Sequence, residues 1–510
     1  MKRNLILGIV ALLVLSMFAA CAKNPEAADP GNPQVNEEET VPNVKDDITL
    51  ITVLNTESFD PYSGANQDKT VLRLMFDTLF NYDENGNIIP CLAESWEDDG
   101  MTLTIKLRED VMFTDGSPLT ADDVVYAFEC YTAEPAISWV VDYAGTCEKV
   151  DEYTVVIHKP TPYAPTMSVL TEYGYIVPSG LHSASPEDFS ENPVGSGPYK
   201  FVSQEADGSV IFTANEEYFL GAPYIKNVTV NPPVEPSTAV IALETGEVDL
   251  IANMPMAQKQ VIQNNEDLVY VEKKGWVMNT LLLCGEKFSD VNLRKAIYYA
   301  MDLESIVMIG NEGVGEPAKE LCSDIIMGDY AGQVPFGEYD IQKAEEYLAA
   351  SGYTEGTEFT LSITPDFASV AQVIQSNLAQ IDIDVTIEQL DLNALYAKMF
   401  DGTIEMTVTY IGNSMTTIES IIDAYNANPF DMLLHKNDEL GTAIDAMKNE
   451  FDEEARGILI VDALQKIKDN ADMIPLFEQT ATFAHSAELS GVQDIAAASY
   501  IYYVNQMKFE

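Results

Sequence analysis

The sequence predicts an α/β protein built from two or three domains. Its 510 residues exceed the usual size of one domain, which is about 100–200 residues. Segments with the two-residue period of a strand alternate along the chain with segments that have the 3.6-residue period of a helix. This alternation favours helices layered on sheets. The content of hydrophobic residues, 46%, is enough for a sizeable core.

In the first half of the chain, the clearest helix start is at Thr120. Thr120 and Asp123 have the spacing of a capping box, which predicts a helix from residue 121 onward. Apolar residues alternate with polar ones in other segments, and a Gly follows one apolar helical run. We predict strands over 102–107, 153–157 and 248–251, and a helix over 237–244.

In the second half, acidic residues precede two helical patterns. Asp290 and Asp340 are each followed by apolar residues at helical spacing, so we expect both to cap helices. Ser369 and Gln372 match a second capping box, with an apolar stripe behind them. A strand is predicted over 385–390, where apolar and polar residues alternate.

The charge of the chain excludes one class of partner. It has 82 acidic and 27 basic side chains, a formal net charge of -55, and such a surface repels nucleic-acid phosphates. Its four histidines are never within one helical turn of each other, so no metal site is predicted. We find no P-loop, dinucleotide-binding or nucleophile-elbow motif, and we predict no catalytic residue and no cofactor.

Residues 1–21 have the features of an export signal. Lys2 and Arg3 precede an apolar run over 5–18, which is too short for a stable membrane span of about 20 residues. Two alanines then precede Cys21, which resembles the lipobox of a bacterial lipoprotein, although Phe18 departs from its usual Leu. We predict lipidation of Cys21, with a signal peptide over 1–21. The alternative is ordinary cleavage after an alanine, with Cys21 as a free thiol.

Residues 22–46 are predicted to be a disordered tether. They contain four prolines and an acidic run but almost no large apolar residues, so they cannot bury enough surface to offset the entropy of ordering. The other five cysteines cannot all pair with one another, and their spacing fits no zinc motif. Cys130 and Cys147 are the nearest pair, and whether they form a disulfide or remain buried thiols stays open.

A series of motifs follows one order over nearly the whole chain. They are 59–61, 113–128, 193–199, 215–218, 221–224, 246–249, 288–302, 339–353 and 375–390. The series resembles family 5 of the extracellular solute-binding proteins, the peptide- and nickel-binding group. Most of these residues suit turns and helix caps, so the motifs describe the scaffold more than the ligand site.

The resemblance implies a two-lobed, periplasmic-binding-protein-like α/β fold of type II, in the large family 5 variant, with the ligand in a cleft between the lobes. We expect lobe I over 47–276, with an inserted subdomain over about 80–190. Lobe II then covers 277–474, and 475–510 return to lobe I. The two crossings are expected near 276–279 and 471–475. Closure of hinged lobes around a ligand is a known type of motion.

The resemblance also implies where the ligand binds. Peptide-binding relatives pair the ligand's amino group with an aspartate in a W-x-x-D segment, and a buried ligand charge needs such a partner. The corresponding residues here are Tyr410, Asn413 and Ser414, so the acidic group is replaced. Lys398 lies near a family arginine position, but a lysine matches a carboxylate less well.

Three aromatic residues are further candidates for ligand contact. Trp139 lies where relatives place an aromatic ring against the ligand, Trp276 lies near the first crossing, and Phe477 follows the second. Aromatic rings stack on peptides, sugars and cations. For each ring, packing in a core is the competing interpretation.

The resemblance therefore predicts a monomeric, lipid-anchored receptor on the outer face of the cytoplasmic membrane. It would deliver a peptide-like small solute to an ABC permease and catalyse no reaction. The replaced acid keeps a second ligand class open, which is a non-peptide solute such as a sugar, an amine or a metal complex. Two other functions also remain open: an extracellular hydrolase with paired carboxylates, and a sensor of the same fold without a permease.

Overall fold

The computed structural model describes residues 45–63, 68–83, 87–254, 258–411, 417–424, 438–492 and 502–510. The predicted signal peptide, Cys21 and almost all of the predicted tether lie outside these residues, as do Asn413 and Ser414. Residues 44–510 form one compact unit. Within the described part of the chain, no helix combines the length and the apolar character that crossing a membrane requires.

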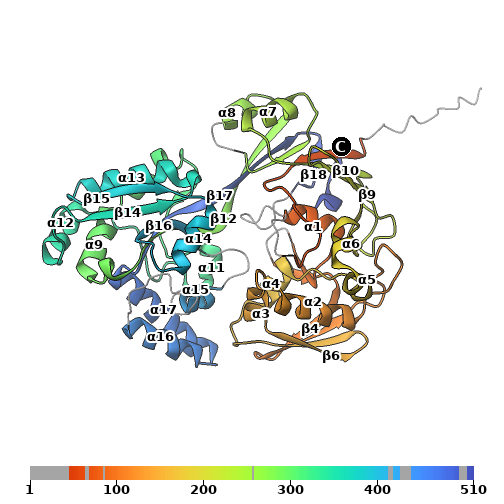
Figure 1. Cartoon of the computed structure of the whole chain (residues 1–510), viewed down its shortest axis with the longest axis horizontal. Coiled ribbons are helices and arrows are strands. Elements are labelled where there is room, and N and C mark those ends of the chain that lie inside the picture. Colours follow the sequence, from red (N-terminus) through yellow and green to blue (C-terminus); the bar gives the residue numbers. More distant parts are fainter. Residues whose placement is uncertain are drawn as a thin grey trace, which may run out of the picture. The chain divides into compact units, whose positions relative to one another are not determined.

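A mixed sheet runs through most of this unit (Figure 1). Its described strands lie in the order β15, β14, β16, β12, β17, β11, β1, β10, β9 and β8, and β13 pairs with β17. Their bounds are β1 Asp47–Ile51, β8 Tyr199–Gln204, β9 Val210–Ala214, β10 Asn227–Asn231, β11 Leu250–Ala252, β12 Leu268–Leu283, β13 Glu316–Pro317, β14 Glu358–Ile363, β15 Asp384–Gln389, β16 Met406–Ile411 and β17 Met473–Ser486.

A separate four-stranded antiparallel sheet has the order β4, β5, β7 and β6. These strands span Ala93–Asp98, Thr102–Leu107, Thr154–His158 and Thr146–Asp151 in that order. Helix α2 packs against β6 and β7 (Figure 1). Two small hairpin sheets pair β2 (Phe80–Tyr82) with β3 (Ile88–Pro90), and β18 (Leu489–Ser490) with β19 (Lys508–Phe509).

Helices surround these sheets, and α13, for example, packs against β14 and β15. The α-helices are α1 Lys69–Met75, α2 Ala121–Ala133, α3 Trp139–Ala144, α4 Thr166–Tyr173, α5 Ser179–Ala184, α6 Pro186–Glu191, α7 Pro236–Glu244, α8 Lys259–Gln263, α9 Val291–Ala300, α10 Leu303–Ser305, α11 Asp324–Met327, α12 Ile341–Ala350, α13 Ala368–Ala379, α14 Leu392–Phe400, α15 Ile418–Ala424, α16 Asp438–Lys448 and α17 Glu453–Asn470.

Two large hydrophobic cores lie in this unit. The first core contains buried residues between positions 48 and 252 and between 483 and 509. The second core contains buried residues between positions 278 and 477, together with Tyr163. The two cores agree with the two-lobed fold, since each lobe needs a core of its own. The boundaries of the lobes remain a proposal.

The two longest strands, β12 and β17, link the cores. They pair antiparallel from Leu268 opposite Ser486 to Leu282 opposite Met473, with register shifts between Lys274 and Met278 and between Asn279 and Thr280. Within β17, residues up to Phe477 belong to the second core, and Phe483 belongs to the first. The change of core in β17 thus falls a few residues after the expected crossing at 471–475.

Most of the predicted helix starts and strands are confirmed. The Asp123 carboxylate accepts a hydrogen bond from the Thr120 amide at 2.8 Å, as a capping box requires. The Asp290 carboxylate accepts from the Asn292 amide at 2.8 Å, and Asp340 caps α12. The strands predicted over 102–107, 153–157, 248–251 and 385–390 correspond to β5, β7, β11 and β15, and the helix over 237–244 corresponds to α7.

The predicted capping box at Ser369 is wrong. Helix α13 begins one residue earlier, at Ala368, and its N-cap residue, Phe367, makes no side-chain capping bond. A 3₁₀ turn over Pro365–Phe367 leads directly into the helix. The fixed φ angle of Pro365 suits the start of a helical turn, so the chain coils before Ser369 is reached.

The five cysteines at and after Cys91 are all free thiols in the structure. Cys130 and Cys147 therefore form no disulfide here. Burial raises the pKa of Cys147 to about 12, and the Glu148 carboxylate adds to this increase. A thiol with such a pKa carries little thiolate at neutral pH, which agrees with a packing role.

Candidate solute-binding site

A chain of contacts begins at Trp139, the first residue of α3. The Trp139 ring lies 4.8 Å from the Tyr173 ring, edge-on at 83°. Tyr173 is the last residue of α4, and its ring lies 4.2 Å below the ammonium of Lys69, the first residue of α1. A cation over an aromatic face is stabilised by the ring quadrupole. Both aromatic side chains are half-buried.

Lys69 also forms an ion pair with Glu172. The Lys69 ammonium lies 2.7 Å from the carboxylate, and the Glu172 side chain is fully buried while 20% of Lys69 is exposed. Burial lowers the pKa of Lys69, but the Glu172 carboxylate raises it further, and the net shift is upward. The lysine therefore remains charged, and its side chain is the partly exposed member of the pair.

The contacts continue from Glu172 to Trp276. The Tyr82 hydroxyl donates to Glu172 Oε1 at 3.4 Å, and the Tyr82 ring lies 6.1 Å from the Trp276 ring at 68°. Trp276 is a residue of β12 and also packs against the second core. We call the six residues Trp139, Tyr173, Lys69, Glu172, Tyr82 and Trp276 the tryptophan array.

Arg73 supports the array from one helical turn beyond Lys69. Its guanidinium donates from Nη1 to Asn81 Oδ1 at 2.9 Å, and from Nη2 to the Thr171 carbonyl oxygen. The Arg73 side chain is buried, and its guanidinium lies 5.5 Å from the Tyr503 ring centre. Burial lowers the pKa of Arg73, while the neighbouring Tyr503 and other groups raise it more, so the side chain stays charged.

The array contains a charged lysine, whose side chain is partly exposed, beside aromatic rings. An ammonium binds carboxylates by charge-assisted hydrogen bonds, and the rings bind apolar or planar groups. Sequence analysis found Trp139 and Trp276 but missed Lys69, Glu172, Tyr82 and Tyr173. One signal was available, because Lys69 and Arg73 are four residues apart in a chain with few basic residues, which predicts two cations on one helix face.

Two other predicted residues, Tyr410 and Phe477, lie on β16 and β17, the strands on either side of β12. Asn279 of β12 is opposite Tyr410 of β16 on one side and opposite Phe477 of β17 on the other. Tyr410 is 53% exposed, whereas the Phe477 side chain is buried in the second core. The structure thus joins Trp139 to Trp276 through the array and places Tyr410 and Phe477 on opposite sides of β12. Their contacts with a ligand remain predictions.

Two further features lie outside the array. The Lys398 ammonium is already paired with the Glu388 carboxylate at 2.5 Å. A pocket of about 670 Å³ opens at the start of α17, and its lining includes Tyr330, Ile458 and several carboxylates but no residue of the array. In the described part of the chain, no group of acidic, histidine or cysteine side chains could hold a metal ion.

Comparison with known proteins agrees with this fold. The model of the bacterial extracellular solute-binding proteins, family 5 middle region, matches residues 87–430. The glutathione-binding protein GsiB of Pectobacterium atrosepticum is 26% identical over an alignment 461 residues long, which covers 85% of this chain and 89% of that protein.

Two solved structures have the same fold. NikA from Brucella suis, in complex with Fe(III)-EDTA, matches with a TM-score of 0.80 and 23% identity over 91% of this chain and 100% of its own. The periplasmic binding protein DppA from Helicobacter pylori, in complex with the peptide STSA, matches with a TM-score of 0.77 and 23% identity, covering 92% of this chain and 98% of its own. The match of the family model over two thirds of the sequence identifies this chain as a member of family 5 of the bacterial extracellular solute-binding proteins.

Proposed function

We propose that this chain is the solute receptor of an ABC importer and that its ligand is a peptide or peptide-like molecule with a carboxylate. The tryptophan array is the observation that carries the proposal. The Lys69 side chain is partly exposed while that of Glu172 is fully buried, so the charge nearer to a solute would be positive. The receptor encloses the solute, releases it to a membrane permease and catalyses no reaction.

The aromatic members of the array supply the rest of the recognition. Trp139 and Tyr173 are half-buried on one side of Lys69, and Trp276 and Tyr82 lie on the side of Glu172. Rings in this arrangement cover apolar side chains of a peptide at low entropic cost, because an aromatic side chain has few rotatable bonds. The peptide backbone can bind through main-chain hydrogen bonds.

A non-peptide solute is the second candidate. It is favoured by Asn413 and Ser414, which stand where peptide-binding relatives have an acid, so the sequence offers no fixed anion there for an amino terminus. A carboxylate-bearing small molecule or chelate would use the same cation of Lys69. The two candidates differ at the amino end of the ligand, and peptides with free and with acetylated amino termini distinguish them.

Tryptophan fluorescence tests the proposed site, because the chain has only three tryptophans. Trp96 packs edge-on against Phe80 at 5.0 Å and lies outside the array, so it serves as the matched control. A peptide mixture should change the emission of the wild type and of Trp96→Phe. In Trp139→Phe the change should shrink, and the affinity should fall by about 10-fold because a stacking ring is reduced. An undiminished change in the double variant Trp139→Phe/Trp276→Phe would refute this site.

We further propose that Cys21 carries the lipid that holds the receptor on the outer face of the cytoplasmic membrane. The support is the short apolar run before Cys21 and the polar, proline-rich segment after it. Cells given labelled palmitate should incorporate the label into the wild type and not into Cys21→Ala. The variant should also move from the membrane fraction to the soluble fraction. Equal labelling of the two proteins would exclude lipidation at this residue.

A further inference from the structure

Tyr163 is buried in the second core, although its neighbours in sequence belong to the first core. Tyr163 is located between β7 and α4, and the buried residues of these elements, such as Val155 and Leu170, belong to the first core. The Tyr163 side chain is only 7% exposed, and it is part of the second core. The segment that carries it therefore reaches from one core to the other.

This segment, residues 159–165, is a stiff arm. It contains Pro160, Pro162 and Pro165, and each proline fixes its own φ angle and restricts the residue before it. The Ala164 amide donates to the Thr161 carbonyl oxygen at 3.1 Å, which closes a turn that contains Tyr163. We call residues 159–165 the proline arm. A stiff arm loses little conformational entropy when its tip binds.

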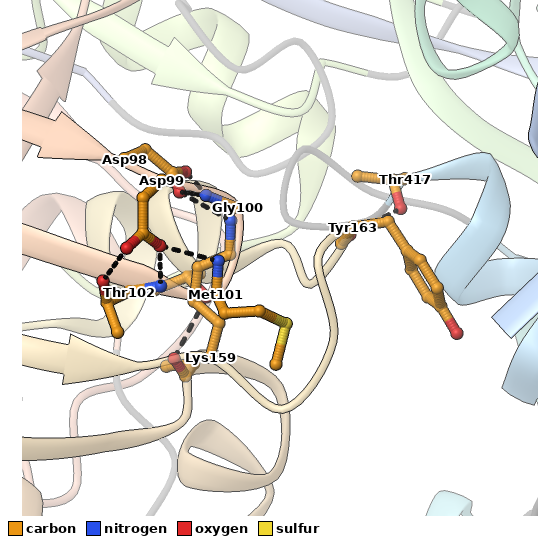
Figure 2. Close-up of polar contacts among 10 residues, drawn as sticks. Asp98, Asp99, Gly100, Met101, Thr102, Lys159, Tyr163 and Thr417 are labelled. Atoms are coloured by element: carbon orange, nitrogen blue, oxygen red, sulfur yellow. Dashed lines mark hydrogen bonds and ion pairs between the residues drawn. The ribbon is translucent and has the colours of Figure 1, made fainter. Parts of the chain in front are cut away.

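The base of the proline arm is fixed to the turn between β4 and β5 (Figure 2). The Lys159 amide donates to the Met101 carbonyl oxygen at 2.8 Å, and the Lys159 ammonium lies 2.9 Å from the Asp98 carboxylate. Asp99 stabilises the same turn, since its carboxylate accepts from the Met101 amide at 3.0 Å and from the Thr102 amide at 2.7 Å. The arm is therefore a fixed projection of the first lobe.

The tip of the arm is held by side chains of the second lobe. The Thr417 hydroxyl, at the start of α15, donates to the Tyr163 carbonyl oxygen at 3.5 Å (Figure 2). The Arg456 guanidinium, from α17, lies 5.9 Å from the centre of the Tyr163 ring. Arg456 is itself held by the Glu419 carboxylate at 3.8 Å, and both side chains are largely buried. Ring burial, a cation–π contact and a long hydrogen bond thus meet at one tip.

We propose that the proline arm is a latch that holds the two lobes closed. Tyr163 enters the second lobe when the lobes approach and leaves it when they separate, so the protein itself supplies part of the closing free energy that a solute would otherwise have to provide. This inference rests on the proposed function, in which closure encloses a solute. The latch contact forms whenever the lobes close, with or without a solute between them. It therefore slows solute release.

The test compares the solution scattering of Tyr163→Ala with that of the wild type, both without added solute. An aromatic ring buries roughly 150–250 Å². Its removal should therefore lower the ratio of closed to open molecules by about 10- to 100-fold. We expect a larger radius of gyration in Tyr163→Ala, and a solute dissociation rate at least about 10-fold higher. Tyr153→Ala truncates a tyrosine that packs against the first core, and it should leave the radius of gyration unchanged.

Two milder variants keep the test decisive if Tyr163→Ala does not fold. Thr417→Val removes the hydroxyl donor, and Arg456→Gln removes the cation above the ring. Both should increase the radius of gyration, but by less than Tyr163→Ala does. Scattering curves that coincide for the wild type and all variants that fold would overturn the latch. Failure of the wild type to bind any solute would instead overturn the proposed function, and the scattering comparison, made without solute, would still decide the latch.

Discussion

Replacing Arg294 with methionine should lower the free energy of unfolding by about 3–5 kcal/mol, because it removes the cation from a buried ion pair. The Arg294 guanidinium lies 3.3 Å from the Asp472 carboxylate, with 5% of the arginine side chain and none of the aspartate side chain exposed. It also donates to the Asn470 carbonyl oxygen at 2.9 Å and the Phe288 carbonyl oxygen at 2.8 Å. Arg294 thereby ties α9 to the connection between α17 and β17.

Urea unfolding followed by circular dichroism measures this loss. The control is Arg108→Met, which breaks the ion pair of Arg108 with Asp110, whose carboxylate is 2.7 Å away. That pair is 29% and 61% exposed, and an exposed pair contributes less than about 1 kcal/mol. If the two variants lost similar free energies of unfolding, burial would not be the reason that the Arg294 ion pair stabilises the protein.

The second large effect concerns the charges of the tryptophan array. In the double variant Lys69→Met/Glu172→Gln, the ion pair becomes a neutral pair of similar volume. Such replacements change stability little, so we expect the free energy of unfolding to stay within about 1 kcal/mol of the wild type. The affinity for a carboxylate-bearing solute should fall by about 10- to 100-fold, because the proposed binding cation is gone. Calorimetry measures both quantities.

Two comparisons separate binding from stability in that experiment. The single variant Glu172→Gln leaves Lys69 mostly buried without its carboxylate, and it should be less stable than the double variant. Lys106→Met/Glu94→Gln neutralises an ion pair of 2.5 Å whose side chains are 51% and 53% exposed, and it should alter neither quantity. Unchanged solute affinity in the array variant would exclude Lys69 as the binding cation.

Local signals made much of the fold predictable. The caps at Asp290 and Asp340 depend on residues within one turn, and the strand at 102–107 depends on its own alternation. The prediction failed at Ser369, where a proline four residues earlier starts a turn before the expected cap. The order of strands in the large sheet could not be derived in this way, since β12 pairs with β17 about 200 residues away in sequence. The family resemblance implied only that two crossings join the lobes.

The site was predicted less completely than the fold. Trp139 and Trp276 were identifiable as rare aromatic residues at positions that the resemblance singled out. Glu172 could not be recognised, because its partners Lys69 and Tyr82 are 103 and 90 residues away in sequence. A carboxylate in an acidic chain carries no signal until the structure buries it beside a cation.

The pairing of β12 with β17 also limits how the lobes can move. The segments that connect the lobes are hydrogen-bonded to each other on both sides of the register shift between Lys274 and Met278. Such a ribbon resists sliding of one strand along the other, because sliding would break the hydrogen bonds between the strands. The pairing is interrupted at two register shifts, between Lys274 and Met278 and between Asn279 and Thr280, so we expect flexing there, about an axis that crosses both strands. In the proposed closure, such flexing would return Tyr163 to the same place in the second core each time the lobes close.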